Sequence, residues 1–382
     1  MSATSASGGR VGSIDIVRGA VMVLMAIDHV RVYSGLPAGG PTPGIFFTRW
    51  VTHFCAPAFV FLAGTSAFLY RRTHDDLSRF LLSRGAWLVV LELTVIRLAW
   101  TFNLDFAHYM LAGVIWVIGW SMILMAGLVK LPVSAVGVIG LVIVAGHNLV
   151  GPRIMQLVQE SPDGWAGALG KILYAGPAAG PIGPLSVLYS LVPWIGVMAA
   201  GYAFGTVVIM EPARRRPLCL AIGLSAIALF LLLRGFNLYG DPRPWKNGLL
   251  TFLNPTKYPA SLNFLLMTLG PTIALLPLLD HARGPVARWL TVFGRVPFFF
   301  YLLHIPLIHL LAIGVSLARH GEISPWLFAN HPMGNGEPPD GYTWSLGWLY
   351  AVWGLAIVAL YFACRWYAEL KARSDNRWLS YL

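Results

Sequence analysis

The apolar segment 14–34 carries four ionisable groups whose types and spacing could do chemistry: Asp15, Arg18, Asp28 and His29. Arg18 and His29 are eleven residues apart. On a helix that turns about 100° per residue, they lie on nearly the same face, about 16 Å apart along the axis. Because lipid does not solvate ionisable groups, their presence in a membrane-length segment indicates a functional site.

An imidazole at His29 suits proton transfer. A reaction that removes a proton from a substrate near neutral pH needs a base, and a neutral histidine can serve as that base. Asp28, the preceding residue, is a second catalytic candidate, with an ion pair to Arg31 three residues later as the alternative. Asp15 and Arg18 have the same spacing, and a simple ion pair between them is an equal alternative.

The elements that must position these groups are apolar helices. Of the 382 residues, 57% are hydrophobic and 11% are charged, whereas soluble proteins carry about a quarter of charged residues. Ten apolar runs approach the ~20 residues that cross a bilayer as helix: 14–34, 53–70, 84–103, 108–129, 132–151, 185–208, 217–235, 262–280, 292–318 and 344–364. The sequence therefore predicts an all-α, polytopic integral membrane protein with about ten transmembrane helices.

The domain organisation follows from the same pattern. We expect a disordered Ser/Gly-rich segment at 1–12, a transmembrane domain over 13–366 and a cytoplasmic tail at 367–382. The second helix is expected to begin near His53, which could cap it or take part in chemistry. Glu92 and Arg97 are costly in lipid, and we expect them to find partners on other helices.

The distribution of positive charge predicts the topology. The net charge is +11, and with the amino terminus inside, sixteen Lys and Arg residues fall in inner segments and nine in outer ones. This positive-inside bias places both termini in the cytoplasm and explains the basic composition without a nucleic-acid partner. The long outer loops, at roughly 152–184, 236–261 and 319–343, indicate that a polar partner or substrate is met at the outer face.

The cysteines indicate no metal site and no disulfide framework. The three of them are scattered without a CxxC pair: Cys55, Cys219 and Cys364. No metal is expected.

Two segments near the amino terminus carry a family resemblance. SIDIVRGAVMVLMAIDHVR followed by FCAPAFVFLAGTSAFL resembles the opening of the heparan-α-glucosaminide N-acetyltransferase-like family. It is similar, more distantly, to membrane acyltransferases that modify bacterial surface glycans. Both groups open with an Arg-Gly pair and a polar residue eleven positions after the Arg, a His in the glycan acyltransferases, and this position is His29 here.

Two later segments extend the resemblance. NPTKYPASLNFLLMTLGP at 254–271 is similar to a signature of bacterial members, and FGRVPFFFYLLHIPLIHLL at 293–311 resembles the late helix of both groups, with His304 in the matching place. One departure concerns catalysis. The lysosomal enzyme carries its active His between the first two helices, where this chain has PAGGPTPGIFFTRWV, so His29 is our substitute for that role.

The resemblance implies an acetyltransferase that uses acetyl-CoA as donor and a glycan or amino sugar as acceptor, in the bacterial inner membrane. The expected catalytic residues are His29, His304 and Asp28. Acetyl-CoA is expected to contact Arg18, Arg295 and Ser66 at the inner side. The acceptor is expected to contact His53, Asn254, Lys257 and Tyr258.

Two other functional classes remain as alternatives. Intramembrane His and Asp groups also occur in proton-coupled secondary transporters, although the sequence has no internal repeat. A non-catalytic membrane scaffold is the third hypothesis. The sequence leaves open the acceptor, an acyl group other than acetyl, direct transfer against an acyl-histidine relay, and the oligomeric state, for which a homodimer is one option.

Overall fold

The structure, a computed structural model, describes residues 12–374. The segment predicted to be disordered therefore lies outside the described residues except for Gly12, which begins the first helix. The last helix continues to Arg373, through the first part of the predicted tail, and residues 375–382 lie outside the described part.

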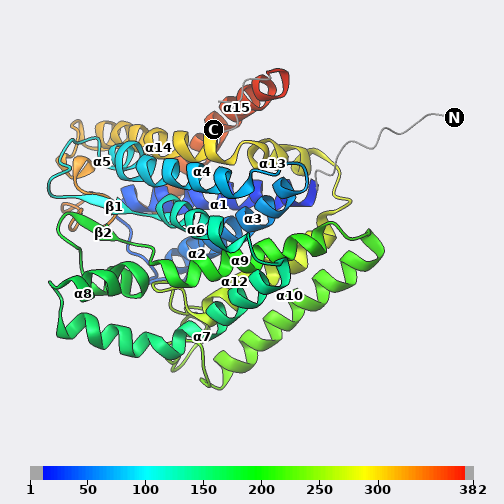
Figure 1. The fold of residues 1–382 in the computed structure, drawn as a ribbon. Coiled ribbons are helices and arrows are strands. Elements are labelled where there is room, and N and C mark those ends of the chain that lie inside the picture. The colour runs from blue at the N-terminus through cyan, green and yellow to red at the C-terminus, as the bar shows by residue number, and fades with distance from the viewer. Residues whose placement is uncertain (1–11, 375–382) are drawn as a thin grey trace.

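The fold is helical (Figure 1). The α-helices and β-strands are α1 Gly12–Ser34, α2 Pro43–Trp50, α3 Cys55–Arg71, α4 Leu77–Leu91, α5 Arg97–Thr101, β1 Met110–Ala112, α6 Val114–Leu128, α7 Val133–Glu160, α8 Trp165–Gly170, β2 Leu185–Val187, α9 Leu191–Val208, α10 Pro212–Gly235, α11 Leu249–Phe252, α12 Leu262–Leu279, α13 Pro285–Arg295, α14 Pro297–His320 and α15 Leu346–Arg373. A 3₁₀ turn, η1 Val51–Phe54, joins α2 to α3, and a π-helical turn, η2 Glu92–Ile96, joins α4 to α5. Three further short turns are η3 Lys171–Ala175, η4 Gly176–Ala179 and η5 Pro325–Phe328.

Each of the ten predicted apolar runs contains helix. Within residues 12–374, seven helical stretches are long and apolar enough to cross a membrane. Three predicted runs fall outside that set: the charged α1, the charged stretch at 77–101, and α6, which has 15 residues. In lipid a helix satisfies every backbone hydrogen bond within its own segment, which is why such apolar sequences form helices.

The structure corrects two details of the sequence prediction. The second helical stretch begins at Pro43 rather than near His53, because Thr42 caps α2 by accepting a hydrogen bond from the Ile45 N–H, and Pro43 suits the first helical position. His53 is therefore buried inside a continuous helical stretch and caps nothing. The all-α prediction also missed a short pair of parallel β-strands, in which Met110–Ala112 of β1 pairs with Leu185–Val187 of β2.

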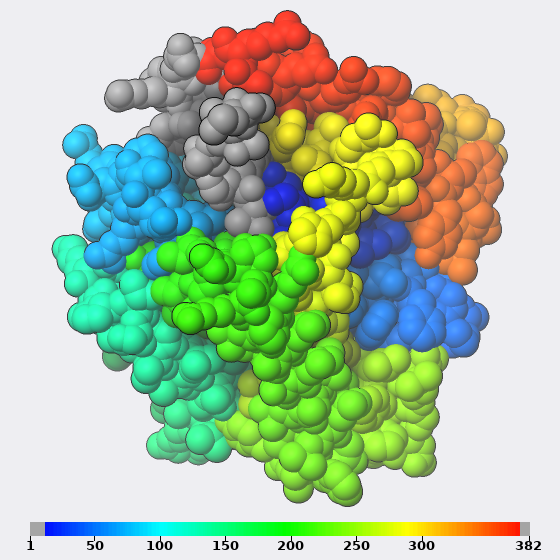
Figure 2. All heavy atoms as spheres, turned by 90° about the vertical axis from the view of Figure 1, so that its right-hand side faces the viewer, coloured from blue at the N-terminus to red at the C-terminus, as the bar shows by residue number. Residues whose placement is uncertain are grey.

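The bundle has two unlike ends. Figure 1 shows β1, β2 and α8 at one end, which we call the loop end, and α13 at the other, which we call the basic end because of the Arg-rich connections there. The start of α1 and the end of α15 lie towards the basic end (Figure 1). Figure 2 looks onto the basic end and shows part of α1 in dark blue near the middle of the face, beside the yellow α13.

Glycines allow the closest helix contacts. A Cβ on Gly64 of α3 would lie 2.0 Å from the Met198 carbonyl oxygen of α9, and a Cβ on Gly201 of α9 would lie 2.0 Å from the Phe61 carbonyl oxygen of α3. Small residues at such positions let helix backbones approach each other in a membrane bundle. This packing fixes the crossing of α3 and α9 in the middle of the bundle.

The Arg-Gly pair of α1 depends on the same effect. A Cβ on Gly19 would lie 1.9 Å from the Leu290 carbonyl oxygen of α13. We expect Gly19→Ala to lower the stability of the folded protein by about 1–3 kcal/mol, because backbone rather than a flexible side chain must move. Thermal unfolding in detergent measures this, with Gly314→Ala as the matched control, since a Cβ at Gly314 meets nothing within 4 Å. Equal melting temperatures for the two variants would contradict the expectation.

Candidate active site

Two histidines from opposite ends of the sequence meet inside the bundle. His29 Nδ1 of α1 and His304 Nε2 of α14 are 2.5 Å apart, and the two rings are stacked with centroids 4.7 Å apart. His304 is completely buried. Both are among the expected catalytic residues, but their contact could not be predicted from the sequence.

The hydrogen bonds of His304 determine which nitrogen of each ring carries the proton. His304 Nδ1 lies 2.6 Å from the Tyr301 carbonyl oxygen, which can only accept, so Nδ1 carries the hydrogen. In a neutral His304 ring Nε2 is then an acceptor, and the His29 Nδ1–H donates to it. His29 Nε2 is left with a lone pair, and no residue within 12–374 forms a hydrogen bond with it. The arrangement therefore presents a base at His29 Nε2.

His29 lines a cavity of about 600 Å³, which we call the His29 cavity. Aromatic side chains form much of its wall: Trp100, Tyr189, Tyr258, Tyr301 and Trp326. Trp100 lies edge-on to the His29 ring, with centroids 4.8 Å apart. Burial raises the pKa of the Tyr189 phenol well above its usual value, so this hydroxyl stays protonated and can donate a hydrogen bond. A cavity with aromatic walls and a few hydroxyls suits a sugar-sized ligand.

Asp28 does not orient His29. Its carboxylate accepts a hydrogen bond of 2.7 Å from Arg31 Nε, which also forms the expected ion pair three residues along the helix. Arg31 Nη1 also donates to the Leu36 carbonyl. The pair lines the His29 cavity and anchors the end of α1.

The buried Glu92 fixes the beginning of α6. Its Oε2 accepts a hydrogen bond of 3.1 Å from the Ile115 N–H. This N–H is in the first turn of α6, whose N–H groups have no partner within the helix. This confirms the expected partner on another helix. For Arg97 that expectation is wrong: its guanidinium donates to the carbonyls of Asn103, Asp105 and Tyr109, because the chain after α5 turns back over it. Glu92 also lines a cavity beside His29, whereas Arg97 fixes the chain that follows α5.

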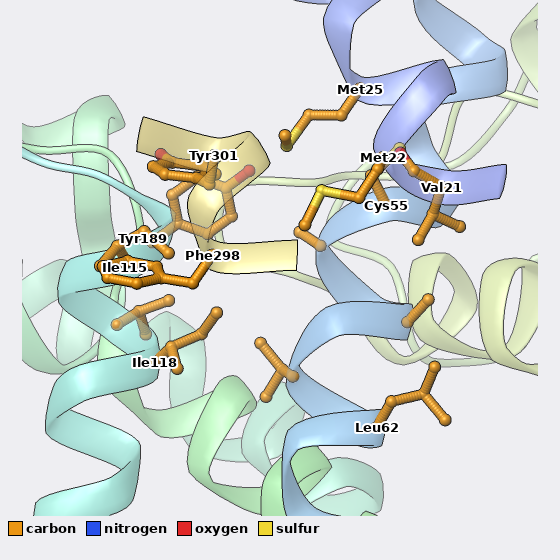
Figure 3. Close-up of a cluster of buried hydrophobic side chains, with 14 of the residues drawn as sticks. Val21, Met22, Met25, Cys55, Leu62, Ile115, Ile118, Tyr189, Phe298 and Tyr301 are labelled. Atoms are coloured by element: carbon orange, nitrogen blue, oxygen red, sulfur yellow. The ribbon is translucent and has the colours of Figure 1, made fainter. Parts of the chain in front are cut away.

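A second cavity lies towards the basic end. It has a volume of about 350 Å³ and is lined by Arg18, Ser66 and Arg84, and we call it the Arg18 cavity. Arg18 Nη2 donates to Ser66 Oγ at 3.0 Å, and Arg18 Nη1 lies 3.6 Å from Asp15 Oδ1, the ion pair that the spacing predicted. The rest of the wall is apolar. Figure 3 shows Met22 of α1 across from Ile115 and Ile118 of α6 and Phe298 of α14, all of which line this cavity.

Two residues belong to both cavities. Val114 and Tyr301 line the His29 cavity and the Arg18 cavity alike. A small void of about 40 Å³ lies beside them, lined by His29, Val114 and Phe59 among others. His29 therefore lies near the residues that the two cavities share.

A third cavity adjoins the His29 cavity at the loop end. It has a volume of about 960 Å³, and we call it the Lys257 cavity. All four residues expected to contact an acceptor line it: His53, Asn254, Lys257 and Tyr258. Arg49 and Tyr258 also line the His29 cavity, so the two spaces are neighbours.

The structure separates one predicted residue from the rest. Arg295 is exposed at the end of α13 and lines none of the three cavities, whereas Arg84 of α4 lines the Arg18 cavity. In the sequence Arg84 is only one of the inner positive charges, and Arg49, Trp100, Tyr189 and Tyr301 belong to no expected site. Tyr301 could have been found from the sequence, because it lies one helical turn before His304. The other residues could be assigned to the site only from the tertiary structure.

Metal ligands do not cluster in the part of the chain that the structure describes. No group of three or more His, Cys, Asp or Glu side chains there could hold a metal ion. Cys55, Cys219 and Cys364 are buried and free.

Comparison with known proteins agrees with the resemblance noted in the sequence. The family model described as heparan-alpha-glucosaminide N-acetyltransferase, catalytic, matches residues 10–237, more than half of the chain. The matched part includes α1 with Arg18 and His29, and ends before α14 with His304. No curated protein sequence matches the chain.

Proposed function

Because the chain belongs to the heparan-α-glucosaminide N-acetyltransferase catalytic family, we propose that it is a membrane enzyme that transfers acetyl from acetyl-CoA to a sugar. In this proposal acetyl-CoA enters from the basic end, which lies in the cytoplasm. The acceptor, a hydroxyl or amine of a glycan or amino sugar, enters from the loop end on the other side of the membrane, the bacterial inner membrane. The observation that carries the proposal is the free lone pair of His29 Nε2, near the residues that the His29 cavity and the Arg18 cavity share.

The Arg18 cavity suits the donor. Its narrow apolar space accepts a pantetheine arm, and Arg18 and Arg84 can pair with phosphates near the basic end. The thioester then lies at the boundary marked by Val114 and Tyr301. Arg295, exposed and away from the cavity, has at most a part in attracting the phosphates.

In direct transfer, His29 Nε2 takes the proton from the acceptor hydroxyl or amine as that atom attacks the acetyl carbonyl carbon. The carbon–sulfur bond breaks, and the CoA sulfur leaves with the electron pair and receives the proton from His29. His304 holds the His29 ring in the required tautomer, and the Tyr301 carbonyl in turn holds His304. The ion pair of Asp28 and Arg31 gives Asp28 an electrostatic and positioning role at the cavity wall.

The same lone pair also permits a relay in which His29 Nε2 attacks the thioester and carries the acetyl group before the acceptor takes it. Isotopically labelled acetyl-CoA, incubated with purified protein, tests the proposal and separates the two routes. Label on His29 without acceptor indicates the relay, and label only on an added amino sugar indicates direct transfer. Absence of acetyl-CoA binding, together with proton-coupled solute uptake into vesicles, would contradict the proposal and favour a transporter.

Arg18 and Arg295 differ in a measurable way. We expect Arg18→Gln to raise the KM for acetyl-CoA by about 10- to 100-fold, the loss expected when a charge-assisted contact to phosphate is removed. Arg295→Gln is the matched comparison, and we expect little change from it because its side chain lines no cavity of the site. Steady-state kinetics over a range of acetyl-CoA concentrations measures both. A larger effect from Arg295→Gln would contradict the assignment of the donor site.

A further inference from the structure

The Lys257 cavity contains positive charge without matching negative charge. The Lys257 side chain is 8% exposed, and its ammonium lies 5.3 Å from the centroid of the Tyr258 ring. Within residues 12–374 no carboxylate lies within 4.0 Å of the charged groups of Lys257 or Arg49. The Nε of Arg49 is buried and has no hydrogen-bond partner there.

Two carboxylates in or beside this cavity are already engaged by other arginines. Asp28 is within electrostatic range of Arg49 and Lys257, but its ion pair of 2.7 Å is with Arg31. Asp241, the acidic residue in the wall of the Lys257 cavity, lies 3.4 Å from Arg234 and accepts a hydrogen bond from the Thr256 N–H. Neither is available to neutralise Lys257 or Arg49.

His53 adds a second and independent observation. Its side chain lines the same cavity and is 3% exposed, and neither ring nitrogen has a hydrogen-bond partner among the described residues. A buried imidazole without partners is costly, and a ligand that accepts its N–H hydrogen bond removes that cost. An incoming anion likewise stabilises the buried Lys257 and the half-buried Arg49, neither of which has a carboxylate partner.

We propose that the Lys257 cavity binds an anionic group, a phosphate or a carboxylate, that belongs to the acceptor itself. Arg49, Lys257 and His53 hold this group, while the hydroxyl or amine to be acetylated reaches His29 Nε2. Arg49 and Tyr258 line both cavities, so one acceptor molecule can occupy the two spaces at once. This inference rests on the proposed function and narrows its substrate class to acidic sugars.

Three acceptors with the same reactive amine test the inference: glucosamine, glucosamine 1-phosphate and glucosamine 6-phosphate. We expect at least one phosphorylated acceptor to exceed glucosamine in kcat/KM by about tenfold, the effect of one charge-assisted hydrogen bond. Lys257→Gln and Arg49→Gln should each reduce that ratio towards one. Lys246→Gln, an exposed cation of the same loop that lines none of the cavities described, should keep the ratio of the wild type.

Calorimetric binding without acetyl-CoA separates this inference from the proposed function. Tighter binding of a phosphorylated acceptor that is lost in Lys257→Gln supports the anion site even when no transfer follows, in which case the proposed function fails alone. Transfer at equal kcat/KM to all three acceptors overturns the inference and leaves the proposed function standing. Inorganic phosphate that binds as tightly as the phosphorylated sugars also overturns it, because the site would then serve a free anion.

Discussion

Replacing His29 by alanine is expected to reduce kcat for acetyl transfer by about 100- to 10,000-fold, the range that removal of a general base produces. The reason is geometric: His29 lines the His29 cavity and its Nε2 is free, because the Nδ1 of the same ring is hydrogen-bonded to His304. The KM for acetyl-CoA should change little, because the proposed donor site is the Arg18 cavity, which Arg18 and Arg84 line and His29 does not. Single-turnover kinetics with labelled acetyl-CoA measures the loss.

His74→Ala is the control for His29→Ala. His74 is exposed after the end of α3 and lines none of the cavities of the site, so its replacement should leave transfer unchanged. The melting temperature of each variant checks that it is folded, since His29→Ala leaves the buried His304 Nε2 without its donor. Transfer by His29→Ala at the wild-type rate would show that another group takes the proton.

Replacing His304 by leucine is expected to lower kcat by about 100-fold with little change in the KM for acetyl-CoA. His304 lines neither the Arg18 cavity nor the His29 cavity, and in the proposed mechanism it acts through His29 as a positioning residue. Without its Nε2 as acceptor, the His29 Nδ1–H loses its partner, and the tautomer with a protonated Nε2 becomes accessible. An orienting group that loses its acceptor function in this way can cost up to about 10,000-fold in a catalytic triad.

His304→Gln distinguishes orientation from packing. Its side-chain carbonyl can accept from the His29 Nδ1–H, so we expect this variant to recover part of the activity lost in His304→Leu. Purely structural damage would instead lower the melting temperature of both variants and leave no difference in kcat between them. Wild-type kcat in His304→Leu would contradict the positioning role.

The two ion pairs within α1 could be predicted from helix geometry alone, and the structure contains both of them. Asp15 with Arg18 and Asp28 with Arg31 are each three residues apart, and side chains at that spacing meet on any α-helix. Arg18 and His29 are further apart on the same helix and line the Arg18 cavity and the His29 cavity respectively. Such relations depend on one helix, so they could be derived without the rest of the fold.

Relations between helices could not be derived in the same way. Arg84 rather than Arg295 lines the Arg18 cavity because of how α4 and α13 pack against the other helices. His53 lies inside a helical stretch because Thr42 and Pro43 start that stretch earlier than its apolar pattern indicates. The charge excess around Lys257 appears only when Asp28 and Asp241 are seen to be engaged by Arg31 and Arg234.

The sequence by itself determined the membrane class, the family and the stripe of Arg18 and His29, because hydrophobic composition and helical periodicity are properties of contiguous residues. The tertiary structure alone decided that His29 meets His304, 275 positions away, and that the Tyr301 carbonyl, through His304, leaves the lone pair on His29 Nε2. Contacts of that kind depend on where helices cross. In this bundle the crossings are set by glycines such as Gly19, whose missing side chain lets α13 pack directly on α1.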